Sequence, residues 1–202
     1  MRGINLSVMS GTLVGMTGTK GAIPRWVVPS TLEVNDCHRL DCQVAEVTGA
    51  HDTLGQILAL EWVCGLRDAP LTDRAEQPVT RAMARAESWV ALCDAAGQSD
   101  PTDGDWRQLG AAPLPAVISN AAFSYGAWRM LTWLLGERAE PPEELPQRDE
   151  DGTLPPWEQR YVARPNPDSP TWQAAQQRRR ERQRAEAFAA WQLARRRRDT
   201  PV

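Results

Sequence analysis

Hydrophobic residues recur every three or four positions along most of the chain, which is the pattern of amphipathic α-helices. It predicts helices over residues 53–64, 78–97, 116–135 and 171–198, with a shorter helix over 35–49. Glycine and proline follow the periodic stretches, and helices commonly stop at these residues. The sequence therefore predicts a mainly α protein built as a small helical bundle.

Two of the predicted helices share a pattern at an offset of 71 residues. Residues 53–70 and 124–141 match at these pairs: Gly55/Gly126, Leu60/Leu131, Trp62/Trp133, Gly65/Gly136, Arg67/Arg138 and Pro70/Pro141. We interpret the match as a duplicated helical hairpin, the alternative being two unrelated helices that end in the usual glycine and proline. Glycine inside a helix costs about 1 kcal/mol relative to alanine. Its recurrence at Gly55 and Gly126 predicts that the two helices approach closely there.

Composition divides the chain into four parts. These are a glycine-rich N-terminal arm (1–34), a helical core (35–136), an acidic proline-rich loop or linker (137–170) and an arginine-rich C-terminal helix (171–202). Half of the 16 prolines lie in the third part, and regular structure is not expected at that density.

The N-terminal arm lacks helical periodicity and has β-forming residues between its glycines. It is expected to be irregular or β-like, with Gly11–Val14 and Trp26–Val28 as candidate strands. Two alternatives are a loose arm and a translation start at Met9 or Met16.

Charge is distributed unevenly between the body and the C-terminal end. The whole chain has a net charge of −3, but residues 171–202 alone carry +6 and residues 1–170 carry −9. Such an asymmetry is typical of a segment that docks on an anionic partner. The candidate partner-binding residues are Arg178, Arg179, Arg180, Arg182, Arg184, Arg195, Arg196, Arg197, Arg198 and Trp172.

The predicted function is a non-enzymatic accessory or interaction protein that docks nucleic acid or an acidic protein surface through these arginines. A competing interpretation is that the arginines are satisfied within the chain, by the helix dipole and by acidic residues at 100–105 and 137–151. Bases could also stack on tryptophan, and Trp106, Trp157 and Trp172 are the candidates in or beside polar segments.

Two other classes of function remain as alternatives. One is a structural or assembly component that self-associates through the helical seam, with the C-terminal helix reaching the acidic loop of a neighbouring subunit in a homo-oligomer. The other is an enzyme whose site is not recognised. The two histidines, His38 and His51, lie in no catalytic motif.

Metal binding and membrane insertion have little support in the sequence. Cys37, Cys42 and His51 are weak candidates for a metal site, because a second closely spaced ligand pair is missing. No cofactor is predicted. No apolar run approaches the roughly 18 residues that a membrane span requires, and no secretory signal is evident. A cytoplasmic protein with reduced thiols and no membrane partner is therefore expected.

Overall fold

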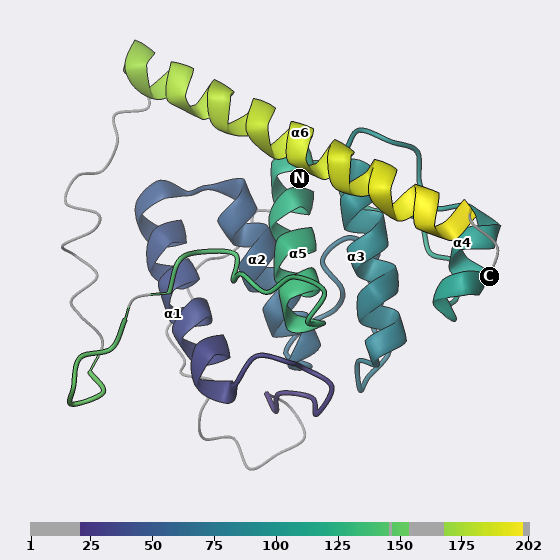
Figure 1. Cartoon of the computed structure of the whole chain (residues 1–202), viewed down its shortest axis with the longest axis horizontal. Helices are drawn as coiled ribbons and strands as arrows, with labels where there is room; N and C mark the ends of the chain where they lie inside the picture. The colour runs from purple at the N-terminus through teal and green to yellow at the C-terminus, as the bar shows by residue number, and fades with distance from the viewer. Residues whose placement is uncertain (1–20, 146, 154–167, 200–202) are drawn as a thin grey trace.

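The computed structural model describes residues 21–145, 147–153 and 168–199. These residues form six helices and no strand (Figure 1). The helices are α1 (Thr31–Thr48), α2 (His51–Val63), α3 (Arg81–Ala95), α4 (Asp103–Leu109), α5 (Ala121–Leu134) and α6 (Pro170–Asp199). The prediction of a mainly α bundle with a long C-terminal helix is confirmed.

Helices α2 and α5 lie at the centre and pack against each other more extensively than any other pair. Helix α1 flanks α2 and α3 flanks α5, while α6 runs across one end of the bundle over α5 and α3 (Figure 1). This packing differs from the predicted hairpins. Helix α3 packs mainly on α5, and its direct contact with α2 is slight.

The two glycines predicted to mark a close approach lie where α2 crosses α5. A methyl group on Gly55 would overlap the carbonyl oxygen of Phe123, and one on Gly126 would overlap the carbonyl oxygen of Asp52. Phe123 follows Asp52 by the same 71-residue offset. The contact is therefore reciprocal, and the predicted close approach is confirmed. Duplication of the unit remains a prediction.

Both central helices also end in the same way. Gly65 and Gly136 follow them with positive φ angles of 75° and 72°. The N–H of each glycine donates to the carbonyl of a tryptophan, Trp62 or Trp133. Positive φ is a conformation that glycine adopts without steric cost. The repeated Trp-x-x-Gly spacing thus specifies a helix end.

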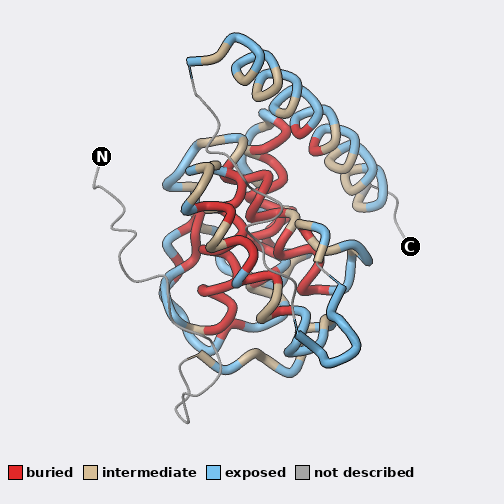
Figure 2. Tube along the Cα trace, turned by 90° about the vertical axis from the view of Figure 1, so that its left-hand side faces the viewer, coloured by how far each residue is buried: buried red, intermediate tan, exposed pale blue. Residues whose placement is uncertain are grey.

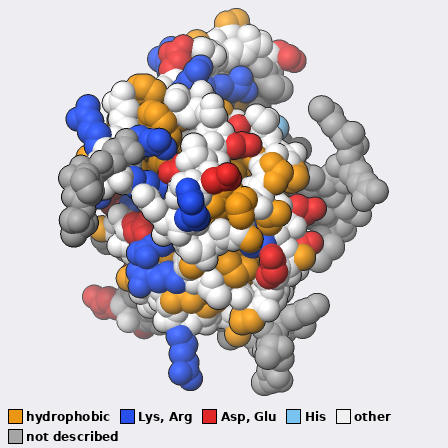
Figure 3. Space-filling view, turned by 90° about the vertical axis from the view of Figure 1, so that its right-hand side faces the viewer, with side chains coloured by type: hydrophobic (Ala, Val, Ile, Leu, Met, Phe, Trp, Pro, Cys, Tyr) orange, Lys and Arg blue, Asp and Glu red, His pale blue; other side chains and the backbone are white. Residues whose placement is uncertain are grey.

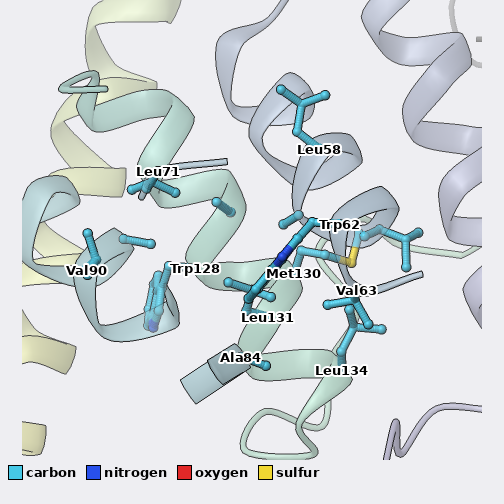
Figure 4. Close-up of a cluster of buried hydrophobic side chains, with 14 of the residues drawn as sticks. Leu58, Trp62, Val63, Leu71, Ala84, Val90, Trp128, Met130, Leu131 and Leu134 are labelled. Atoms are coloured by element: carbon cyan, nitrogen blue, oxygen red, sulfur yellow. The ribbon is translucent and has the colours of Figure 1, made fainter. Parts of the chain in front are cut away.

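The core fills the space between the central helices and their neighbours (Figure 2). Trp62 from α2 and Met130, Leu131 and Leu134 from α5 are fully buried and lie in one cluster (Figure 4). Large buried apolar side chains such as these each contribute about 1.5–3 kcal/mol through burial.

Residues 21–30 of the N-terminal arm are irregular and pack on the bundle, whereas residues 31–34 form the first turn of α1. Residues 26–28 form no strand, so that prediction is wrong. The N–H of Val28 instead donates to the carbonyl of Leu134 at 2.9 Å, and Nε1 of Trp26 donates to that of Val79 at 3.0 Å. Gly11–Val14, Met9 and Met16 lie outside the described residues.

Several helices begin at other residues than the sequence predicts. Helix α5 begins at Ala121, after the cap Asn120, and not at residue 116. Helix α1 begins at Thr31, because Ser30 and Glu33 form a capping box at its N-terminus. Helix α3 begins at Arg81, after the cap Thr80, and so Pro78 is not its first residue. Helix α4 lies between residues 97 and 116, where the sequence pattern predicts no helix, and a capping box of Thr102 and Asp105 starts it.

None of the helices in the described ranges is long and apolar enough to cross a bilayer.

Candidate functional site

Helix α6 has a face that lies against the bundle and a face that is exposed. The buried and half-buried residues recur at spacings of three and four positions: Trp172, Ala175, Gln176, Arg179, Gln183, Glu186, Ala187, Ala190, Trp191, Ala194, Arg195 and Arg198. This spacing forms one stripe along a helix. Ala187 is fully buried at its centre, where α6 crosses the bundle. The stripe divides the nine arginines into inner and outer groups.

Arg179 belongs to the inner group in the N-terminal half of α6. Its Nη2 lies 2.6 Å from Oδ2 of Asp52 and 3.9 Å from Oε1 of Glu143. Nε2 of Gln183 donates to the same Asp52 oxygen at 2.6 Å. Asp52 is buried at the start of α2, so both of these donors are needed to satisfy it.

Arg195 and Arg198 form the inner group at the C-terminal half. Both contact the carboxylate of Asp105 on α4, with Nη1 atoms at 3.3 and 3.1 Å. The Arg198 guanidinium also lies 3.9 Å from the ring centroid of Trp89, a cation–π contact. Burial opposes ionisation of Asp105, but hydrogen bonds from Thr102 and Arg198 and the charge of Arg195 outweigh it. They hold the pKa of Asp105 below its ordinary value.

The middle of α6 is tied to α5 through Glu186. Its carboxylate accepts hydrogen bonds from the hydroxyl of Tyr125 and from Nη2 of Arg138, both at 2.7 Å. Arg138 also lies over the ring of Trp128. This repeated arginine therefore has a structural role, as does Arg67, which pairs with Glu61 on α2.

The outer group is exposed. Five of its arginines form no ion pair or hydrogen bond with any described residue: Arg178, Arg180, Arg182, Arg184 and Arg197. Arg196 is exposed as well. At 1.5 Å per residue, residues 178–184 present four of these guanidinium groups within about 9 Å along the axis. One exposed acid, Glu181, lies among them and accepts a hydrogen bond from Gln177.

A groove of about 670 Å³ lies beneath this cluster of outer arginines. Its walls are the N-terminal half of α6, the start of α2 and the start of α5. Arg180, Arg184 and Trp172 line it from α6, and His51 and Asn120 line it from below. The Asn120 side-chain amide lies 2.9 Å from Nδ1 of His51, which joins the two helix starts.

One aromatic pair lies next to the arginines on α6. The rings of Phe188 and Trp191 stack with centroids 6.1 Å apart and an interplanar angle of 18°. Phe188 follows Arg184 by one helical turn, and 39% of its surface is exposed. Sequence reasoning missed this pair, although the spacing of four residues between Arg184 and Phe188 was a usable signal.

The candidate stacking tryptophans have different positions. Trp106 is buried, so its predicted exposure is wrong. Its ring helps to fill the core because the stretch around it is helical. Trp172 is half-buried in the groove. Trp157 lies outside the described residues.

The structure does not bring the weak metal candidates together. Sγ of Cys37 is hydrogen-bonded to Asp41, and Sγ of Cys42 lies 3.7 Å from Nε2 of His38. His51 instead lies in the groove. Across the described residues, no group of three or more histidine, cysteine or acidic side chains is arranged to hold a metal ion.

The ends of α6 differ in electrostatic character. Figure 3 looks onto the end of the molecule where α4 and the C-terminus lie, and basic, acidic and hydrophobic side chains are interleaved there. At this end Asp105 offsets part of the positive charge of Arg195 and Arg198. Four of the five arginines of α6 that lack an ion pair or hydrogen bond to a described residue lie in its N-terminal half, at positions 178, 180, 182 and 184.

Comparison of the chain with protein-family models, with curated proteins and with solved structures finds no match.

Proposed function

We propose that this protein is a non-enzymatic accessory protein that binds nucleic acid along the outer face of α6. The observation that carries the proposal is the set of exposed arginines at 178, 180, 182 and 184, which lack partners among the described residues. The inner arginines hold the same helix to the bundle. At about 100° per residue these cations form two pairs, Arg178 and Arg182 on one flank of α6 and Arg180 and Arg184 on the other, and such a cluster is suited to the closely spaced charges of a phosphate backbone.

Nucleic acid is favoured over an acidic protein by the neighbouring aromatic pair. Phe188 exposes part of its ring one turn beyond Arg184, and Trp191 supports it from the bundle side. Base stacking on aromatic rings contributes about 1–3 kcal/mol per base and tolerates any base. An acidic protein would use the arginines but would gain little from an exposed ring.

The interpretation that arginines of α6 pair with acidic residues of the same chain is supported at Arg179, Arg195 and Arg198, which contact Asp52, Glu143 or Asp105. We therefore assign these three to docking of α6, and assign partner binding to the outer group and Trp172.

Self-association through the helical seam is less well supported. The seam predicted over residues 116–135 consists of Val117, Ala121, Ser124, Trp128, Leu131 and Leu135. The last four are buried within the single chain, and a second copy could reach them only if the bundle opened. Only Val117 and Ala121 are exposed. We also propose a cytoplasmic location, where nucleic acid is accessible and the four free thiols would remain reduced.

The proposal is tested by fluorescence polarisation at low salt with labelled duplex DNA, single-stranded DNA, single-stranded RNA and polyglutamate. Salt-sensitive binding to at least one nucleic acid, and none to polyglutamate, is expected. Binding to polyglutamate alone would favour an acidic protein partner. No binding to any of the four would overturn the proposal.

A further inference from the structure

A second cluster of ionisable side chains lies between α1 and α2, outside the proposed interface. Sγ of Cys42 lies 3.7 Å from Nε2 of His38, which is one turn earlier on α1. The same nitrogen lies 3.4 Å from Oε1 of Glu61 on α2. Glu61 is also paired with Arg67, just beyond the end of α2. A thiol, an imidazole, a carboxylate and a guanidinium are thus connected in series.

The cluster carries an excess of positive charge beside the sulfur. Burial alone would lower the pKa of His38, but its contacts with Cys42 and Glu61 raise that pKa to about 9. His38 is therefore an imidazolium at neutral pH. The single negative charge of Glu61 is shared between His38 and Arg67. Burial raises the pKa of nearby Asp41 well above its usual range, which weakens Asp41 as a counter-charge.

The geometry also defines what His38 does. Cys42 and Glu61 both contact Nε2, so the ring does not relay a proton from one nitrogen to the other as in a cysteine protease. His38 instead acts as a fixed cation, with its N–H directed between a carboxylate oxygen and the sulfur. Such a neighbour stabilises negative charge on a nucleophilic sulfur.

The other three cysteines provide a contrast within the same chain. Cys37, Cys64 and Cys93 are buried, whereas Cys42 is half-buried. Burial raises the pKa of Cys64 and that of Cys93 to about 12, and raises that of Cys37 well above its usual range. Thiolate and access are both required for reaction. Neither is expected at these three positions.

We propose that Cys42 is a reactive thiol, positioned by His38, Glu61 and Arg67, that forms mixed disulfides with small disulfide compounds. The Cys42 sulfur attacks one sulfur of the compound RS–SR as a thiolate. A bond forms between Cys42 and that sulfur while the S–S bond of the compound breaks, and RS⁻ leaves with the electron pair and takes a proton from water. Cys42 is oxidised, and the small disulfide is the oxidant.

The experiment follows the reaction of the reduced, full-length protein with dithiodipyridine, a neutral disulfide, at pH 7. Peptide mass spectrometry assigns the modified cysteine. We expect Cys42 to react at least about tenfold faster than the other three cysteines, and His38→Gln to slow it by about tenfold. Asp100→Asn, which removes an exposed charge from the loop between α3 and α4, is the control and leaves the rate unchanged.

Arg67→Gln gives a second measurement that does not depend on the buried histidine. Its side chain is 38% exposed, so the variant is expected to fold, and the loss of one positive charge slows Cys42 severalfold. The proposal is overturned if another cysteine reacts as fast as Cys42 in the folded protein. It is also overturned if His38→Gln and Arg67→Gln both keep the wild-type rate.

Discussion

Nη2 of Arg179 donates a hydrogen bond to Oδ2 of Asp52 across 2.6 Å, joining residues 127 positions apart in the sequence. Gln183 donates to the same oxygen one turn further along α6. Because residues 179 and 183 both face the bundle, residues 178 and 182 lie about 100° around the helix on one flank, and residues 180 and 184 lie about 100° around it on the other. One buried carboxylate on α2 therefore sets the rotation of α6 and the direction in which its outer arginines point.

Asp52→Asn is expected to loosen the N-terminal half of α6. The charged acceptor of two hydrogen bonds is lost, which should lower the free energy of unfolding by about 2 kcal/mol. Amide exchange across residues 172–183 should accelerate more than exchange in α5. Asp68→Asn removes an exposed carboxylate and should change neither quantity. Unchanged protection of residues 172–183 in Asp52→Asn would show that this contact does not hold the helix.

Gly126→Ala is expected to be strongly destabilising, because its methyl group would overlap the backbone carbonyl of Asp52. Backbone cannot move aside as a flexible side chain can, so a loss of about 3 kcal/mol or more is expected in urea unfolding. Gly104→Ala on α4 is the matched control, since its nearest neighbour is a side-chain atom 3.6 Å away. That variant should be neutral or gain up to about 1 kcal/mol. Equal effects of the two substitutions would contradict the close approach of α2 and α5.

Asp105 is expected to make the docking of α6 dependent on pH. Folding lowers the pKa of Asp105. Its carboxylate therefore stabilises the folded protein at pH values above the unfolded-state pKa of about 4, and this stabilisation is lost as the pH falls through the folded-state pKa. The stability difference between wild type and Asp105→Asn should therefore be largest near pH 7 and should shrink below about pH 4. Urea unfolding of both proteins across this range measures the difference. A stability difference that stays constant with pH would mean that the docking of α6 through Arg195 and Arg198 does not depend on the negative charge of Asp105.

The central helices could be predicted from the sequence because each carries its own signals. Helices α2 and α5 have continuous apolar periodicity and end at Gly65 and Gly136, and their internal glycines indicated the crossing point. Helix α4 was missed because its acidic, glycine-containing stretch is typical of a loop. The spacing of Thr102 and Asp105 was the local signal for this helix, because the two residues form the capping box at its start.

The two faces of α6 could not be assigned from the sequence. Its inner stripe consists of alanine, glutamine, arginine, one glutamate and two tryptophans, so it differs little in hydrophobicity from the outer face. The decisive contacts come from Asp52 and Asp105, which tertiary folding brings from distant positions. The spacing of His38 and Cys42 was visible in the sequence. Their link to Glu61 needs the packing of α1 on α2.

The central claim is that the outer arginines of α6 bind a phosphate backbone, and the most direct test compares two triple variants. One variant replaces Arg178, Arg180 and Arg182 by Gln. The other replaces three exposed arginines outside α6 by Gln, namely Arg25, Arg39 and Arg107. The net charge changes equally in both. Affinity for the nucleic acid that binds most tightly is measured by fluorescence polarisation at several salt concentrations.

The α6 variant is predicted to lose at least about tenfold in affinity at low salt, and its slope of log affinity against log salt should fall by about 0.7–0.9 for each phosphate contact removed. The matched variant should keep an affinity and a slope close to those of wild type. Equal weakening by the two variants would contradict the account, because it would show that net charge and not the outer face of α6 drives binding.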